Sequence, residues 1–322
     1  MNRITFADPG GTAFTLFFDA ATGLLTQSSW LIDDPLYSIA GELQRDVIYS
    51  DYRDTNGVRI PFHQAVSYGG DILDDLTTTE LSVNTTPDSL FEVPRGLVQP
   101  PRPQSLVDVS KLGEDAYLVR AAYNSVFVVF NDYVLVIEAP LGDFLTQETL
   151  AAIKRTAPGK PIRYVVPTHY HHDHIGGMRG FVAEGAIVVA TPRTAREVEK
   201  LVATQRALRP DVLATRPHPL GVERFTEQRV FADSTHRVEL YNVGPSPHVA
   251  ELVIAYIPST KVLYEADALD ISAGQTLPGH DDTVDMARKI ETLGLDVQTI
   301  IPTHGRPGTM QDLKAALALT PR

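Results

Sequence analysis

Residues 169–174 place four histidines and one aspartate within six consecutive positions, directly after an apolar, strand-like stretch. Histidine is the commonest metal ligand in proteins, and aspartate is a hard oxygen ligand that can also hold a water molecule. The chain has only 10 histidines in 322 residues, so a chance cluster of surface histidines is an improbable explanation. The spacing H-x-H-x-D-H therefore predicts that four side chains converge on metal from one tight loop: His169, His171, Asp173 and His174.

Three further residues of ligand type follow separate strand-like runs. His248 stands between two apolar runs, whereas Asp267 and His304 each close one. Taken singly, each has an ordinary alternative as a turn or capping residue. Several strand-like runs that all end in a ligand type are harder to explain in that way. Together they favour a metal site to which distant parts of the chain contribute.

This complete set resembles the ligand pattern of the metallo-β-lactamase superfamily of hydrolases, over residues 106–322. The resemblance implies a four-layer αββα sandwich with the metals at one edge, between two sheets. It also implies that Asp267 bridges two metals with separate ligand sets: His169, His171 and His248 for the first, and Asp173, His174 and His304 for the second.

Residues 124–130 and 134–140 also resemble the early hairpin of that family, with departures nearby. Glu138 stands where an aspartate is usual, and Pro140 and Ala266 stand where glycines are usual. These departures concern the surroundings of the ligands and leave the ligands themselves intact.

The ligand types predict hydrolytic chemistry. Three histidines leave a fourth metal position open for water, and zinc lowers the pKa of such a water to about 7. Two metals about 3.5–4 Å apart can share the metal-bound hydroxide and polarise a substrate oxygen. Asp173 is the expected catalytic residue, which orients the water and accepts its proton, and Thr168 is expected to support the ligands. We expect two Zn²⁺ per chain, with iron or manganese as alternatives; without cysteine, no thiolate ligand exists.

Three functions fit this pattern. The first is a dinuclear hydrolase of a small ester, lactone, thioester or β-lactam, and a bridging Asp267 fits the lactonase and thioesterase branches best. The second is a mononuclear iron dioxygenase of a sulfur substrate, which would use fewer ligands. The third is a metal-binding protein without catalysis. Metal stoichiometry distinguishes the first two.

The composition limits the classes of binding partner that we expect for this chain. The chain is 43% hydrophobic and 21% charged, as is usual for a soluble globular protein. A net charge of −12 argues against a nucleic-acid partner and leaves a small-molecule substrate. No run approaches the roughly 18 apolar residues of a membrane span. The start of the chain lacks the pattern of a secretory signal, which favours the cytoplasm by default, or the periplasm if a leader has been removed.

Residues 1–97 differ from the rest and predict an antiparallel β domain of five or six strands. Pairs of apolar runs flank turn sequences, and the Asn-Gly pair within residues 53–57 favours a tight hairpin. A further strand is expected at residues 76–83 and a helical turn at 87–91. Residues 49–94 resemble the curved sheet of lipoprotein-carrier-like proteins, which implies apolar-ligand binding or a homodimer through this sheet. The alternative is a packing module beside the catalytic domain.

A proline-rich linker at residues 98–104 separates this domain from a catalytic domain at 105–322. In the second domain, strand-like and helical patterns follow one another, so that helices can cover buried sheets. Helices are predicted at 143–156, 192–204, 283–294 and 309–319. Strands are predicted at 116–122, 126–131, 134–138, 162–167, 186–190, 228–232, 237–243, 252–257 and 261–265.

Residues near the ligands in sequence are expected to border the substrate. Tyr170 and His172 project from the ligand loop itself. Two further loops are expected near the metals, at residues 206–225 and 275–282. Histidines in these loops are candidate substrate contacts, against a surface role and a helix-start role respectively: His218 and His280. The remaining histidines lie in strand-like runs and are expected to be structural: His63 and His236.

Overall fold

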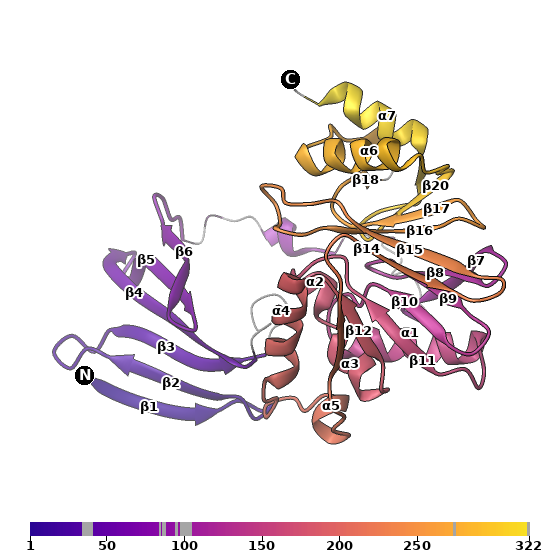
Figure 1. The fold of residues 1–322 in the computed structure, drawn as a ribbon. Helices are drawn as coiled ribbons and strands as arrows, with labels where there is room; N and C mark the ends of the chain where they lie inside the picture. The colour runs from indigo at the N-terminus through magenta and orange to yellow at the C-terminus, as the bar shows by residue number, and fades with distance from the viewer. Residues whose placement is uncertain are drawn as a thin grey trace. The chain divides into compact units, whose positions relative to one another are not determined.

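The computed structural model describes residues 1–33, 41–83, 85, 88–93, 96, 105–272 and 275–320 (Figure 1). The chain divides into an N-terminal unit, Met1–Pro103 with Gln205–Arg209, and a C-terminal unit, Gln104–Thr204 with Pro210–Arg322. The predicted linker, residues 98–104, lies outside the described residues, so the predicted domain boundaries stay a prediction. No helix within the described ranges is long and apolar enough to cross a membrane.

One six-stranded antiparallel sheet dominates the described part of the N-terminal unit, and each strand pairs with the next along the chain. Asn56 and Gly57 join the fourth strand to the fifth with φ values of 53° and 83°, as a tight hairpin turn requires. A short 3-10 helix, η1 (Asp88–Phe91), lies at the predicted helical turn. The strands are β1 (Asn2–Ala7), β2 (Ala13–Phe18), β3 (Leu25–Ile32), β4 (Leu43–Thr55), β5 (Val58–Tyr68) and β6 (Asp71–Thr77).

The strand predicted at residues 76–83 is wrong, because β6 begins at Asp71 and ends at Thr77. The cause is a turn of two glycines, Gly69 and Gly70, whose φ values are 62° and 100°. Glycine adopts positive φ without steric strain. The chain therefore reverses immediately after β5, and Asp71 pairs with Tyr68.

A row of stacked side chains crosses one face of the N-terminal sheet. Directly paired residues share a face of an antiparallel sheet, and Phe6, Phe14, Trp30 and Arg45 are paired in succession. The ring centroids of Phe6 and Phe14 lie 5.6 Å apart, and those of Phe14 and Trp30 lie 5.2 Å apart. The Arg45 guanidinium lies 4.9 Å from the centroid of the Trp30 ring. Stacking on this face therefore ties the first four strands together.

Two mixed sheets form the interior of the C-terminal unit (Figure 1). The first has the order β13-β12-β11-β10-β9-β8-β7 and the second the order β14-β15-β16-β17-β20-β21. The strands of the first are β7 (Asp108–Gly113), β8 (Ala116–Arg120), β9 (Ser125–Val129), β10 (Val134–Ile137), β11 (Ile162–Val166), β12 (Ile187–Ala190) and β13 (Gly221–Arg224). Those of the second are β14 (Gln228–Ala232), β15 (Arg237–Asn242), β16 (Val253–Ile257), β17 (Val262–Glu265), β20 (Thr299–Pro302) and β21 (Gly308–Thr309). A separate small pair is β18 (Ile271–Ser272) with β19 (Gln275–Thr276).

Helices cover the outer faces of the two sheets, which gives the predicted four-layer αββα sandwich (Figure 1). Fully buried side chains such as Leu135, Leu240 and Tyr264 form the core between the sheets. A second core, which includes Ile290 and Leu313, lies beneath the last two helices. The first sheet is covered by α1 (Asp143–Thr156), α3 (Met178–Ala183) and α4 (Pro192–Ala203), and the second by α6 (Asp281–Leu293) and α7 (Met310–Leu319).

All helices and strands predicted for this unit are present, and their ends differ from the predictions by up to two residues. Short elements without a clear apolar period were missed: α2 (His172–Ile175), α3, α5 (Val212–Thr215), β7, β13, β18, β19 and β21. The expectation of a loop at residues 206–225 is therefore wrong in part. β13 is an edge strand that pairs in parallel with β12, and two of its four residues are charged, so no apolar pattern marks it.

A buried arginine fixes the segment between α4 and α5. Arg179 on α3 is 5% exposed and donates hydrogen bonds to the carbonyl oxygens of Val202 at 2.7 Å and Thr204 at 3.1 Å. The same guanidinium forms an ion pair with Asp211. Asp211 in turn accepts a hydrogen bond from the backbone N–H of Ala214 and caps α5. One side chain therefore holds both ends of the stretch of residues 205–209.

Candidate metal centre

The predicted ligands meet at one edge of the C-terminal unit, although they are far apart in the sequence. β10 pairs in parallel with β11, and β17 with β20, so within each pair the carboxyl ends of the strands lie at the same edge. The ligand loop follows β11, Asp267 follows β17, and His304 follows β20. His248 lies in the connection between β15 and β16. The structure brings all seven predicted ligands together in two groups.

Glycines after the ligand loop allow it to pack closely against the start of α1. A Cβ atom on Gly176 would lie 2.2 Å from the carbonyl oxygen of Leu141, and one on Gly177 would lie 2.2 Å from Oγ1 of Thr146. The backbone N–H of Leu141 donates to the carbonyl oxygen of Asp173 at 3.1 Å. The loop is therefore held in place by backbone contacts that only glycine at these two positions permits.

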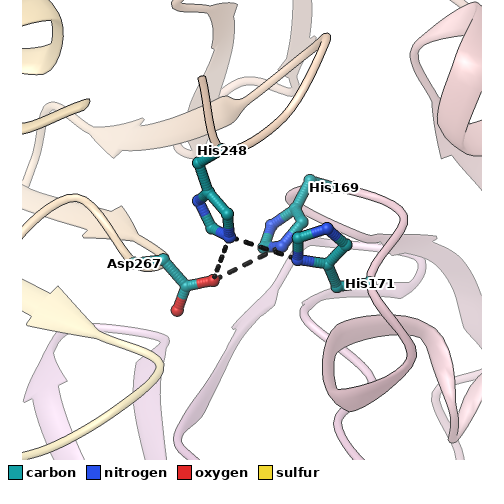
Figure 2. Close-up of side chains that lie close together, drawn as sticks. All are labelled: His169, His171, His248 and Asp267. Atoms are coloured by element: carbon teal, nitrogen blue, oxygen red, sulfur yellow. Dashed lines mark hydrogen bonds and ion pairs between the residues drawn. The ribbon is translucent and has the colours of Figure 1, made fainter. Parts of the chain in front are cut away.

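The first group contains His169, His171, His248 and Asp267, whose ligand atoms all lie within 4.8 Å of one another (Figure 2). His248 Nε2 lies 3.2 Å from His171 Nδ1 and 3.6 Å from Asp267 Oδ2. His169 Nε2 lies 3.4 Å from the same carboxylate oxygen. Tetrahedral ligands at zinc distances of about 2.0–2.1 Å are about 3.3 Å from each other. The spacing of these atoms fits a single divalent ion.

The second group contains Asp173, His174 and His304, again with ligand atoms within 4.8 Å of one another. Asp173 Oδ2 lies 3.4 Å from Nε2 of both histidines. Asp267 also reaches this group, with Oδ2 at 3.1 Å from His174 Nε2 and Oδ1 at 3.0 Å from His304 Nε2. The Asp267 carboxylate therefore faces both groups.

Two buried nitrogen atoms support a metal at this place. Nε2 of His169 and Nε2 of His174 are buried, and each faces Oδ2 of Asp267, at 3.4 and 3.1 Å. Burial of polar atoms is unfavourable unless they are well satisfied, and divalent cations, one in each ligand group, would satisfy both nitrogens. Thr168 lies behind His169 as expected, with its Oγ1 3.2 Å from His169 Nδ1. The donor set of imidazoles and carboxylates fits zinc, and also iron or manganese.

The charged groups of the site shift one another's pKa. Burial alone would raise the pKa of Asp173 and Asp267, but hydrogen bonds from His174 and His304 hold both far below their ordinary range. Burial alone would lower the pKa of His304, but the two carboxylates raise it to about 9. Burial, reinforced by His174, lowers the pKa of His169 well below its ordinary value. Because ligands bind metal in their deprotonated forms, metal binding would release protons from this site.

Two buried carboxylates lie behind the histidines, and the sequence reasoning did not give either of them a role. Glu138 Oε2 accepts hydrogen bonds from Oγ1 of Thr168 at 2.7 Å and Thr303 at 3.1 Å, and lies 3.1 Å from His174 Nδ1. Asp282 Oδ2 lies 3.3 Å from Nδ1 of His248. Glu138 was noted only as a departure from the family pattern. The one sequence signal for Asp282 is its place in the first turn of a helix that follows Asp267.

Residues expected to border the substrate lie at different distances from the ligands. Tyr170 packs edge-on against His171 with ring centroids 5.1 Å apart, whereas His172 begins α2. His218 is exposed, and its Nδ1 atom lies 2.9 Å from the carbonyl oxygen of the neighbouring Pro219. Tyr123, which the sequence did not suggest, packs edge-on against His304 with ring centroids 4.6 Å apart.

The remaining histidines have structural surroundings. His280 precedes α6, and its backbone N–H donates to Thr283 Oγ1 at 3.0 Å, which agrees with the helix-start interpretation. His63 lies 2.6 Å from Asp75 in the N-terminal sheet. His236 contacts two carboxylates on the C-terminal unit, those of Asp115 and Asp233, at 3.1 and 3.0 Å.

Comparison with known proteins assigns most of the C-terminal unit to a family. Residues 119–304, more than half of the chain, match the family model described as Metallo-beta-lactamase superfamily. This range includes all seven candidate ligands.

Two curated relatives share about a quarter of their aligned residues with this chain. The linear primary-alkylsulfatase of Pseudomonas sp. is 26% identical over 203 residues, which cover 50% of this chain and 37% of the relative. The metallo-beta-lactamase type 2 of Elizabethkingia meningoseptica is 25% identical over 166 residues, which cover 49% of this chain and 60% of the relative. The chain therefore spans less than two thirds of the length of these relatives.

Among solved structures, a metallo-beta-lactamase from Pontibacter korlensis matches with a TM-score of 0.52 and 22% identity. The match covers 66% of this chain and 98% of that protein. A likeness at this level of identity shows the fold alone, and it confirms the sandwich that the family resemblance implied.

Proposed function

Because the chain belongs to the metallo-β-lactamase superfamily of hydrolases, we propose that it is a hydrolase with a dinuclear zinc site. Its substrate would be a small molecule with a hydrolysable acyl bond: an ester, a lactone, a thioester or a β-lactam. Two complete ligand groups, joined by one carboxylate, support this assignment over a binding protein without catalysis.

The observation that carries the proposal is the place of the Asp267 carboxylate between the two ligand groups. Its Oδ2 atom lies 3.4 Å from His169 Nε2 in the first group and 3.1 Å from His174 Nε2 in the second. Two-metal hydrolytic sites hold their ions about 3.5–4 Å apart, a separation that one shared carboxylate oxygen can span. A mononuclear iron site could also use this carboxylate together with two histidines, but it would leave the second group, Asp173, His174 and His304, without a metal.

Each ligand group would hold one of the two metals. When bound, the metals would polarise the substrate oxygen and lower the pKa of a water to near neutrality. The residues that would hold the first ion are His169, His171 and His248, those for the second are Asp173, His174 and His304, and Asp267 would contact both.

We assign the catalytic role to Asp173. Its side chain is 21% exposed, so that water can reach it, while His174 and His304 hold its Oδ2 atom at 3.4 Å each. A carboxylate fixed in this way can accept a hydrogen bond from the attacking water, orient it and take up its proton. Glu138 keeps His174 in place from the opposite side of the imidazole ring.

Sulfate esters are a second substrate class. The relative from Pseudomonas sp. is named a linear primary-alkylsulfatase, and the match to it covers half of this chain. Hydrolysis of a sulfate ester requires the same elements as hydrolysis of an acyl ester: an activated water and cations that face the substrate oxygens. An alkyl sulfate therefore belongs among the first substrates to test.

The test combines metal content with turnover on one preparation of the chain, purified without added metal. Elemental analysis gives the metals per chain, and the substrates are nitrocefin, a simple lactone, a thioester, an aryl ester and an alkyl sulfate. Two zincs per chain with hydrolysis of at least one substrate is the expected result. One iron per chain without hydrolysis would contradict the proposal and favour the dioxygenase alternative.

A further inference from the structure

Each histidine that binds a metal has a second ring nitrogen, and the partner of that nitrogen fixes the tautomer and the orientation of the ring. In the second ligand group, a buried carboxylate serves His174 in this way, because Glu138 lies 3.1 Å from Nδ1. In the first group, the partner of His169 is the neutral hydroxyl of Thr168.

His248 is the histidine of the first group that has a buried carboxylate behind it. Its Nε2 atom faces His171 and Asp267 within the ligand group. Its Nδ1 atom points away from that group and lies 3.3 Å from Asp282 Oδ2. His248 lies in the loop between β15 and β16, where its backbone N–H donates to Ser246 Oγ at 3.2 Å, and Asp282 contacts the ring itself.

Asp282 is buried, with 2% of its surface exposed. It lies in the first turn of α6, a 13-residue helix, where backbone N–H groups and the helix dipole stabilise negative charge. His248 faces its carboxylate at 3.3 Å and His280 at 3.6 Å. The adjacent Asp281 is exposed in the same turn.

We propose that Asp282 is a positioning residue that holds His248 with its Nδ1 protonated and its Nε2 directed at the first metal. The inference rests on the proposed two-metal function. It gives the two sites a common design, in which one histidine of each is supported by a buried carboxylate: His174 by Glu138, and His248 by Asp282. The two carboxylates come from separate parts of the chain, because Glu138 directly follows β10 and Asp282 lies in α6.

The test compares two substitutions in one helical turn. Asp282→Asn removes the buried carboxylate, and Asp281→Asn removes an exposed carboxylate and is the matched control. Zinc per chain is measured after dialysis, and zinc affinity by competition with a chromophoric chelator. We expect Asp282→Asn to weaken one of the two zinc sites by about 10–100-fold, the usual effect of losing such a partner, while Asp281→Asn binds like wild type. Equal affinities in the two variants would overturn the proposal.

A second readout reports on the position of the ring itself. In ¹⁵N-edited spectra of the zinc-loaded wild type, the side chain of His248, assigned with His248→Gln, should show a slowly exchanging proton on Nδ1. The same proton should be present in Asp281→Asn and exchange faster in Asp282→Asn. A proton on Nε2 of His248 in the wild type would overturn the proposal, and this measurement needs no folded Asp282 variant.

The two proposals fail in different ways. A wild-type chain that binds no metal would refute the proposed function and, with it, the role of Asp282. A wild-type chain that binds two zincs, with Asp282→Asn unchanged in affinity and in the His248 spectrum, would refute the role of Asp282 alone.

Discussion

Both units of this chain are built on β-sheets, but they bury those sheets differently. In the C-terminal unit, β9, β10 and β16 are buried along their whole length, because each sheet is covered on both faces. In the N-terminal sheet, β1 and β6 are exposed along their whole length. Strands packed from both sides hold their ends in fixed places, and candidate metal ligands lie at such ends. A single sheet depends instead on its hairpin turns and on stacking between neighbouring strands.

The largest expected effect comes from a comparison of two aspartates, one in each unit, that each lie beside a histidine. Asp173→Ala removes the proposed base and a metal ligand, and we expect it to lower the hydrolytic rate by about 10²–10⁴-fold. Asp75→Ala removes the carboxylate 2.6 Å from His63 in the N-terminal sheet and should leave the rate unchanged. Steady-state kinetics on the best substrate measures both. An unchanged rate in Asp173→Ala would contradict the assigned mechanism.

Replacement of one leucine by alanine in each unit tests the difference in burial. Leu240 is 0% exposed in the core between the two C-terminal sheets, whereas Leu76 on β6 is 59% exposed. We expect Leu240→Ala to lower the free energy of unfolding by about 2–5 kcal/mol, and Leu76→Ala to change it by about 0.5 kcal/mol or less. Urea unfolding followed by circular dichroism gives both values. Similar losses for the two variants would show that the N-terminal sheet buries this face in solution.

Stacking in the N-terminal sheet can be tested by itself. Trp30 is the single tryptophan of the chain, so its fluorescence reports on this sheet. Arg45→Ala removes the cation over the Trp30 ring and should destabilise the fluorescence transition by about 0.5–2 kcal/mol, without an effect on hydrolysis. Arg59→Ala, at an exposed position of β5, is the control. Equal unfolding midpoints in the two variants would show that this stacking does not stabilise the sheet.

The smallest expected effect is a pH dependence of the C-terminal unit. Burial would lower the pKa of His236, but hydrogen bonds to Asp115 and Asp233 outweigh it and raise the pKa above its ordinary value. A raised pKa means that the contribution to stability is full below the unfolded pKa and is lost as pH rises through the folded pKa. Urea midpoints of the wild type should therefore fall as pH rises from about 6 to 8.5 relative to those of His236→Asn. Parallel profiles would contradict this contribution.

The sequence was sufficient to predict which candidate ligands come together, but it did not show the buried carboxylates behind them. His169, Asp267 and His304 could be identified because ligand types at the ends of apolar runs form a pattern along the chain. Asp282 and Tyr123 could not, since each is a neighbour of a ligand only after distant segments pack together. Their places depend on helix and loop packing that no period in the sequence encodes.

The prediction of secondary structure from the sequence succeeded and failed along similar lines. Long elements of the C-terminal unit with a clear apolar period were predicted to within two residues at each end. The failures are short or are set by backbone geometry: α2 lies within the ligand loop itself, and β6 begins early because Gly69 and Gly70 turn the chain.

Arg179 makes the positions of α4 and α5 independent of the length of the stretch between them, residues 205–209. It holds Thr204 and Asp211 together, so the stretch of residues 205–209 has little influence on α4 or α5. A Gly-Ser insertion between Ala207 and Leu208 should leave zinc content and hydrolysis unchanged, because loop closure becomes only slowly less favourable with length. The stretch of residues 205–209 is therefore a place where we expect a change of length to leave the metal centre unaffected.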